Sequence, residues 1–126
     1  MPKKQTFLSD VEKTPGGDQK RHLRIIITDS DNDQNQVVVS VTTLKYLSQD
    51  TSCVLQPGDH PFIKEKSIID FKRTTVMSYM QIFNGIQQGL LIRKEDISDE
   101  LLKRIQTAAA KSKYISDEIK SMFVYF

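Results

Sequence analysis

The sequence contains two histidines, His22 and His60, and each of them lies beside charged residues. Histidine is the side chain that ordinarily titrates near neutral pH, so a pair of histidines can act as the base and the acid of one reaction. His60 follows Asp59, whose carboxylate could orient the imidazole ring. Cleavage of RNA by its own ribose needs a base for the 2′-hydroxyl and an acid for the leaving 5′-oxygen. The histidines therefore indicate phosphodiester chemistry as a function to test.

Cations that could hold a phosphate lie around His22 and at the end of the predicted strand that follows His60. Arginine binds phosphate through two parallel hydrogen bonds, and lysine binds it as a point charge. Thr42 can donate one further hydrogen bond to a phosphate oxygen. Each role has a structural alternative: His60 could cap its own loop, and Arg73 could be an ordinary ion-pair partner. The candidate catalytic residues are Arg21, His22, Thr42, His60 and Arg73, and the candidate RNA-binding residues are Lys20, Arg24, Asp59 and Lys72.

No metal ion or other cofactor is expected. The single cysteine, Cys53, has no partner for an internal disulfide or a cysteine-rich zinc site, and its apolar surroundings predict a buried, unreactive thiol. The alternating aspartates of residues 29–33 resemble part of a calcium loop, but Gln34 and Ser40 stand where such a loop needs glycine and glutamate. The sequence also lacks a glycine-rich nucleotide loop, a serine nucleophile elbow and an HExxH pattern.

A hook of residues 58–63 (GDHPFI), between two predicted strands, carries two of these candidates, Asp59 and His60. Pro57 presets φ and Gly58 supplies a positive φ, which predicts a tight turn that presents Asp59 and His60 at its tip. The apolar residues that follow are expected to pin the hook to the body of the protein. Residues 67–73 are then predicted to form a strand that delivers the cations at its end.

Two further strands are predicted on either side of a polar turn. Residues 22–28 contain three consecutive isoleucines, which favour extended backbone, and residues 36–44 form the second strand. Both strands are apolar on nearly both faces, which predicts that they are central in a small barrel or covered by another part of the protein. Residues 6–8 are expected to add a short edge strand. Because side chains alternate along a strand, two pairs share a face within their own strand: His22 with Arg24, and Ser40 with Thr42.

The C-terminal half changes to helical periodicity. Apolar residues recur from Val76 to Ile86 with the spacing of a helix, although the first half of this segment could instead be strand. Residues 87–96 are predicted to be a connector. Ser98 is the predicted N-cap of the next helix, and Ser116 that of a short tail helix that packs on the barrel or on a second copy of the chain. The predicted buried stripe of the longer helix is Leu101, Leu102, Ile105, Ala108 and Ala109.

The composition favours a single globular domain, since the 126 residues are 38% hydrophobic and 27% charged. We expect residues 1–20 to be a polar N-terminal loop, 21–76 the β-barrel core and 77–126 mostly helical. The net charge of +2 permits nucleic acid as a partner without requiring it. Neither a membrane span nor a secretory segment is recognisable, so a cytoplasmic protein is expected.

Four segments occur in a familiar order. A Gly-x-acid-Gln loop precedes a basic residue and an apolar strand, and a second apolar strand ends in threonine. A strand with serine, two apolar residues and Arg-Thr follows, and then an acidic helix start. This order resembles the MazF/PemK family of toxin endoribonucleases. The matching segments are Gly16–Gln19, Val37–Thr43, Ser67–Ile69 with Arg73 and Thr74, and Asp99 and Glu100 with Ile105.

The resemblance implies a small SH3-like, partly open β-barrel with a C-terminal helix, usually a homodimer. It also implies metal-independent cleavage of single-stranded RNA, in which the ribose 2′-oxygen attacks its own phosphate and leaves a cyclic phosphate. The family threonine falls on Thr42, and the family arginine falls on Arg21 or His22. The implied partners are single-stranded RNA and an antitoxin with an acidic, extended segment. The alternative is an inactive SH3-like barrel that binds protein or nucleic acid through the GDHPFI loop, residues 58–63.

Overall fold

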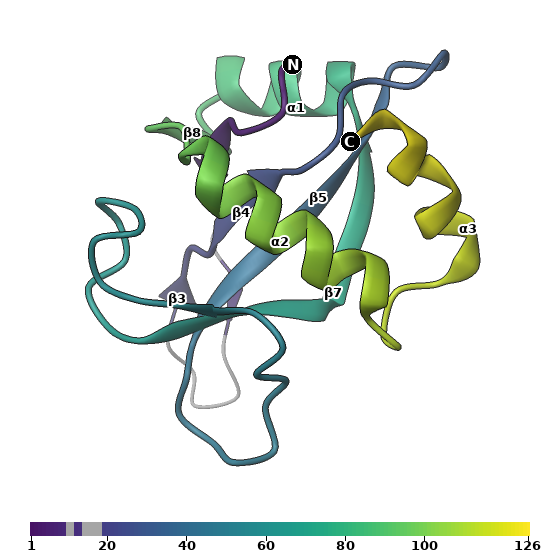
Figure 1. The fold of residues 1–126 in the computed structure, drawn as a ribbon. Helices are drawn as coiled ribbons and strands as arrows, with labels where there is room; N and C mark the ends of the chain where they lie inside the picture. The colour runs from purple at the N-terminus through teal and green to yellow at the C-terminus, as the bar shows by residue number, and fades with distance from the viewer. Residues whose placement is uncertain (10–11, 14–18) are drawn as a thin grey trace.

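The computed structural model describes residues 1–9, 12–13 and 19–126, and shows an antiparallel sheet followed by C-terminal helices (Figure 1). Six strands pair in the order β6-β7-β5-β4-β1-β8, and β2 pairs with β3 in a separate ribbon. Because β6 and β8 do not pair with each other, the sheet is not closed. The predicted fold class, mainly β with C-terminal α in a partly open barrel, is confirmed. The strands are β1 (Thr6–Leu8), β2 (Glu12–Lys13), β3 (Gln19–Lys20), β4 (Leu23–Ile26), β5 (Asn35–Thr43), β6 (Val54–Leu55), β7 (Ser67–Ser78) and β8 (Ile92–Lys94).

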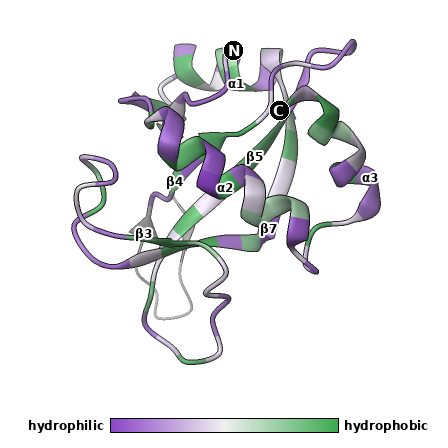
Figure 2. Ribbon diagram, viewed as in Figure 1, coloured by the Kyte–Doolittle hydropathy of each residue, from purple (hydrophilic) through white to green (hydrophobic). Residues whose placement is uncertain are grey.

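Both faces of the central strands are packed, as their continuous apolar sequence predicts. The helices are α1 (Tyr79–Gln87), α2 (Asp99–Lys111), α3 (Asp117–Lys120) and a 3-10 helix, η1 (Ser121–Tyr125). One face of β4 and β5 packs with α2 in the larger core, and the other face packs with Ile82 of α1 in a smaller one. Figure 2 shows the hydrophobic residues concentrated on β4 and β5 beneath α2. The sheet therefore has an α2 face and an α1 face.

Strand β7 bends sharply in its middle. Its register against β5 passes from Ser40↔Asp70 to Val38↔Thr75, so β7 contains extra residues at this point. The Thr74 hydroxyl donates a hydrogen bond to the Phe71 carbonyl across the bend, at 2.8 Å. The bend leaves the intervening cations exposed instead of pairing them with β5.

The prediction for the C-terminal helices is confirmed. The hydroxyls of Ser98 and Ser116 accept hydrogen bonds from the third helical N–H of α2 and α3. The tail packs on the core of its own chain, the first of the two docking alternatives. The Asp29 N–H also donates to the Tyr125 carbonyl, at 2.8 Å. The tail residues against the α2-face core are Ile119, Met122, Phe123 and Phe126.

Replacing Ser98 with alanine is expected to lower the free energy of unfolding by about 1 kcal/mol. The substitution removes the acceptor of the Leu101 N–H, a bond of 3.1 Å. Urea unfolding followed by circular dichroism would measure the change. Ser48→Ala, at an exposed loop position, is the control and is expected to change stability little. An equal loss in both variants would contradict the capping role.

Two predictions are wrong at the edge of the sheet that contains β1 and β8. Residues 6–8 form β1, but this strand lies between β4 and β8 and is not an edge. The predicted connector 87–96 contains β8, which pairs with β1 through Thr6↔Lys94. Strand β8 is short and mostly exposed, so it lacks the alternating apolar pattern that reveals a strand. Among the described residues, no helix is long and apolar enough to cross a membrane.

Candidate functional site

A group of polar side chains lies on the α1 face of the central strands, beyond the part that α1 covers. Arg24 of β4 is directly opposite Ser40 of β5, and Ser40 is opposite Asp70 of β7. His22 immediately precedes β4, and its ring nitrogen Nδ1 lies 3.3 Å from the carbonyl oxygen of Val41, the residue before Thr42 in β5. The neighbouring residues in these strands point to the α2-face core, so the polar ones share the opposite face. Three strands thus bring a guanidinium, two hydroxyls and a carboxylate together, with a histidine just before β4.

The contacts of His22 define which ring nitrogen carries its proton. The Nδ1 atom lies 3.3 Å from the carbonyl oxygen of Val41. A carbonyl oxygen only accepts hydrogen bonds, so Nδ1 must be the donor, and the ring lone pair belongs to Nε2. The His22 backbone N–H donates to the Ser9 hydroxyl at 3.0 Å, which fixes the start of β4. These two bonds hold His22 between Ser9 and Val41.

The other basic residues near His22 have different environments. Arg21 donates from Nη1 to the carbonyls of Ser9 and Leu90, at 3.1 and 2.9 Å, so this guanidinium already joins two loops. Lys20 is in β3, but its side chain lies outside the described part of the structure, as does the Gly16–Asp18 portion of the family-like loop. Of the two residues left open for the family arginine, His22 is the one whose ring contacts β5 beside Thr42.

His60 does not join this group. Its ring is only 2% exposed, although we predicted it at the tip of the hook. Nε2 lies 2.7 Å from the Glu95 carbonyl and must donate to it, while Nδ1 accepts the Phe62 N–H at 3.0 Å. Both ring nitrogens are thus occupied inside the protein. The structural alternative, in which His60 caps its own hook, accounts for these contacts, and we leave His60 out of the site.

Asp59 does not orient His60, contrary to the prediction. The turn itself forms as expected, with Gly58 at φ 101° and the Asp59 N–H donating to the Gln56 carbonyl at 3.1 Å. The carboxylate of Asp59, however, accepts the Gln56 N–H at 2.8 Å and pairs with Arg104 of α2 at 3.3 Å. These contacts clamp the hook against α2, so Asp59 stabilises the hook instead of activating a base.

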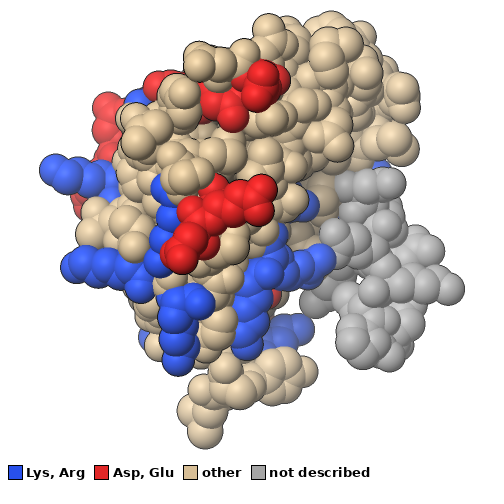
Figure 3. Space-filling model, turned by 90° about the vertical axis from the view of Figure 1, so that its right-hand side faces the viewer, with Lys and Arg blue, Asp and Glu red and all other residues tan. Residues whose placement is uncertain are grey.

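The cations Lys72 and Arg73 lie at the exposed bend of β7. The Lys72 ammonium is 4.9 Å from the centre of the Tyr114 ring, and the ammonium of Lys113 is 5.4 Å from the same ring. Figure 3 shows Lys and Arg side chains gathered over the lower half of the side of the molecule that includes β7 and α3. The bend thus combines cations from two distant parts of the chain with an aromatic ring.

Sequence reasoning missed two members of these surfaces, Asp70 and Tyr114. Asp70 could have been found, because the alternation of Ile69 and Phe71 into the core assigns it to the polar face. Tyr114 follows the C-terminus of α2, and its approach to Lys72 depends on the bend of β7. No local sequence pattern predicts this contact between Lys72 and Tyr114. Within the described residues, no cluster of histidine, cysteine, aspartate and glutamate could hold a metal ion.

The prediction of an unreactive Cys53 agrees with its burial, which raises the pKa of the thiol to about 11. We expect its alkylation by iodoacetamide at pH 8 to be about 100-fold slower than in the urea-unfolded chain, because the thiolate is the reacting form. Since the unfolded thiol ionises first, the stability contributed by Cys53 is expected to fall as the pH rises from 9.0 to about 11. Equal alkylation rates in folded and unfolded chain would contradict this prediction.

Neither a protein-family model nor a curated protein sequence matches this chain. The class of protein is therefore defined by its fold, an open antiparallel sheet with C-terminal helices, and by a polar face on its central strands.

Proposed function

We propose that this chain is a metal-independent endoribonuclease that cuts single-stranded RNA, and that it is the toxin of a toxin–antitoxin pair. The observation that carries the proposal is the contact of the His22 ring with the Val41 carbonyl, which places His22 next to Thr42 of β5. His22 and Thr42 are positions at which the MazF/PemK resemblance implies catalytic residues. The proposal thus has two supports: the order of the family-like sequence segments, and the position of the His22 ring beside β5.

In the proposed reaction Nε2 of His22 removes the proton of the ribose 2′-hydroxyl. The 2′-oxygen forms a bond to phosphorus, and the bond from phosphorus to the 5′-oxygen breaks. The leaving oxygen takes a proton from the imidazolium or from solvent, which leaves a 2′,3′-cyclic phosphate and a 5′-hydroxyl. The Thr42 hydroxyl donates to a phosphate oxygen as negative charge develops there, and the Arg24 guanidinium on the same face adds positive potential.

The bend of β7 supports RNA as the substrate. A single-stranded nucleic acid is commonly bound by cations that follow its backbone and by aromatic rings on which its bases stack. Lys72, Lys113 and Tyr114 offer both features in one place, with Tyr114 40% exposed. The partners that this function implies are a second copy of the chain and an antitoxin with an acidic segment.

The test is incubation of the purified protein with a long single-stranded RNA in EDTA. Thr42→Ala and Thr43→Ala form a matched pair, because the two threonines are adjacent in β5, both partly buried, and on opposite faces of the sheet. We expect discrete fragments with cyclic phosphate ends from the unmodified chain and from Thr43→Ala. Thr42→Ala is expected to cut about 100-fold more slowly. Equal rates in the two variants would exclude Thr42.

Intact RNA would overturn the nuclease proposal in favour of the binding-module alternative. The hook does present a contact residue for that alternative, since Phe62 is 41% exposed beside the buried His60 and Ile63. A gel-shift assay with the same RNA distinguishes the outcomes, because an inactive binder would retard RNA that it does not cut.

A further inference from the structure

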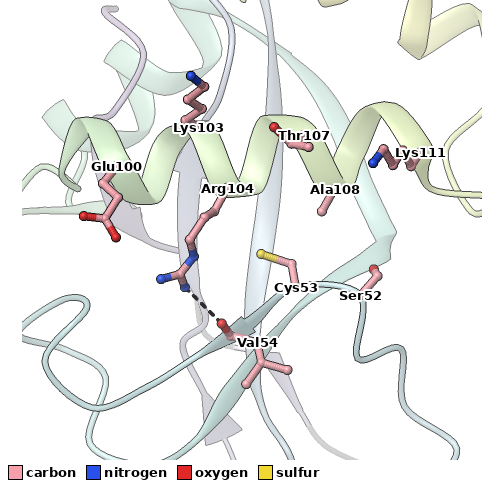
Figure 4. A pocket seen from close by; sticks show the side chains of 9 residues that line it. All are labelled: Ser52, Cys53, Val54, Glu100, Lys103, Arg104, Thr107, Ala108 and Lys111. Atoms are coloured by element: carbon pink, nitrogen blue, oxygen red, sulfur yellow. Dashed lines mark hydrogen bonds between the residues drawn. The ribbon is translucent and has the colours of Figure 1, made fainter.

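A pocket of about 530 Å³ lies between α2 and the segment that contains β6, on the opposite side of the sheet from His22 and Thr42. Its volume is within the range of small-molecule sites, about 300–1,000 Å³. In Figure 4 Cys53 and Ala108 face each other across its middle, with Arg104 toward one end and Lys111 with Ser52 toward the other. The pocket thus has an apolar centre between two polar ends.

The two ends differ in charge. Near the first, Arg104 donates to the Val54 carbonyl at 3.0 Å and pairs with Asp59 at 3.3 Å, and Glu100 lies one helical turn away. Acids therefore balance the cations there. At the second end Lys111 is exposed and has no ion pair with any residue that the structure describes. An anionic group is expected to prefer the second end.

The centre is suited to a hydrocarbon. Cys53 is only 5% exposed, and its thiol stays neutral at physiological pH, so it behaves as a small apolar group. Ala108 is small enough to leave the space above it open, and it belongs to the partly buried residues packed on the core. The centre would therefore cover the apolar part of a ligand whose anionic end reaches Lys111.

We infer that this pocket binds a small amphiphilic carboxylate, with its apolar chain over Cys53 and Ala108 and its carboxylate between Lys111 and the Ser52 hydroxyl. Burial of each methylene group of the chain is expected to raise the affinity about fourfold, and the charged hydrogen bonds decide between a carboxylate and an uncharged ligand. The site uses none of the residues of the proposed nuclease, so the inference stands whether or not the chain cuts RNA.

The test is a titration of the ¹⁵N-labelled chain with octanoate, followed by NMR, with 1-octanol as the uncharged probe of equal chain length. We expect saturable shift changes at the amides of Cys53, Val54 and Ala108, and an affinity for octanoate about tenfold higher than for octanol. Lys111→Glu is expected to weaken octanoate binding at least about tenfold. Lys103→Glu, on the same helix at the balanced end of the pocket, is the matched control and is expected to weaken binding much less.

Thr107→Trp, at an exposed lining position, should fill the pocket and abolish the shifts. The spectrum of each variant without ligand shows whether it remains folded. Equal affinities for octanoate and octanol would overturn the recognition of an anion, and equal losses in Lys111→Glu and Lys103→Glu would overturn the assignment to the Lys111 end. Shifts that are absent, or scattered away from the pocket, would overturn the site itself.

Discussion

If the proposed nuclease reaction holds, replacing His22 with alanine is expected to slow RNA cleavage by about 100-fold or more, because the variant loses the proposed base for the 2′-hydroxyl. His22 is assigned this role because the Val41 carbonyl accepts a hydrogen bond from Nδ1. In the neutral ring the proton is then on Nδ1 and the lone pair is on Nε2. Single-turnover rates with excess protein would measure the chemical step separately from product release.

His22→Asn separates the catalytic role from a structural one. The side-chain amide of asparagine can donate to the Val41 carbonyl from about the position of Nδ1, but it has no counterpart of Nε2. We therefore expect the asparagine variant to recover any stability lost in His22→Ala while its cleavage rate stays equally low. Cleavage at the original rate in either variant would show that His22 is not the base.

The framework of the fold could be predicted from local patterns. The apolar strands on both sides of residues 29–33 become β4 and β5, and the caps at Ser98 and Ser116 begin α2 and α3. These features depend on backbone preferences and short-range hydrogen bonds, which a single sequence reveals. The helical tail could also be recognised, although its docking on its own chain required the structure.

The site was predictable only where strand alternation determines it. His22 and Thr42 were candidates from their types, and the contact of the His22 ring with the Val41 carbonyl places them near each other. The position of His60 follows instead from Thr6 and Glu95, which are distant in sequence but contact its Nε2. A histidine next to an aspartate has the same local sequence whether its ring is exposed or buried, so the sequence could not decide.

Replacing His60 with alanine is expected to lower the free energy of unfolding by about 2–4 kcal/mol. The substitution empties a buried site and removes the partners of the Glu95 carbonyl and the Phe62 N–H. Ile63, three residues after His60, is buried in the α2-face core. Loss of the His60 contacts is therefore expected to loosen the whole hook. Urea unfolding of both proteins would give the difference.

Two partial replacements test which bond matters. Asparagine can occupy the position of Nδ1 and accept the Phe62 N–H, whereas glutamine can reach the position of Nε2 and donate to the Glu95 carbonyl. Because the bond to Glu95 is the shorter, at 2.7 Å, and joins segments far apart in the chain, we expect glutamine to recover more stability than asparagine. RNA cleavage measured where each variant is fully folded should be unchanged. A specific loss of cleavage in stable, folded His60→Gln would return His60 to the catalytic site, because the hook would then be intact and only the imidazole missing.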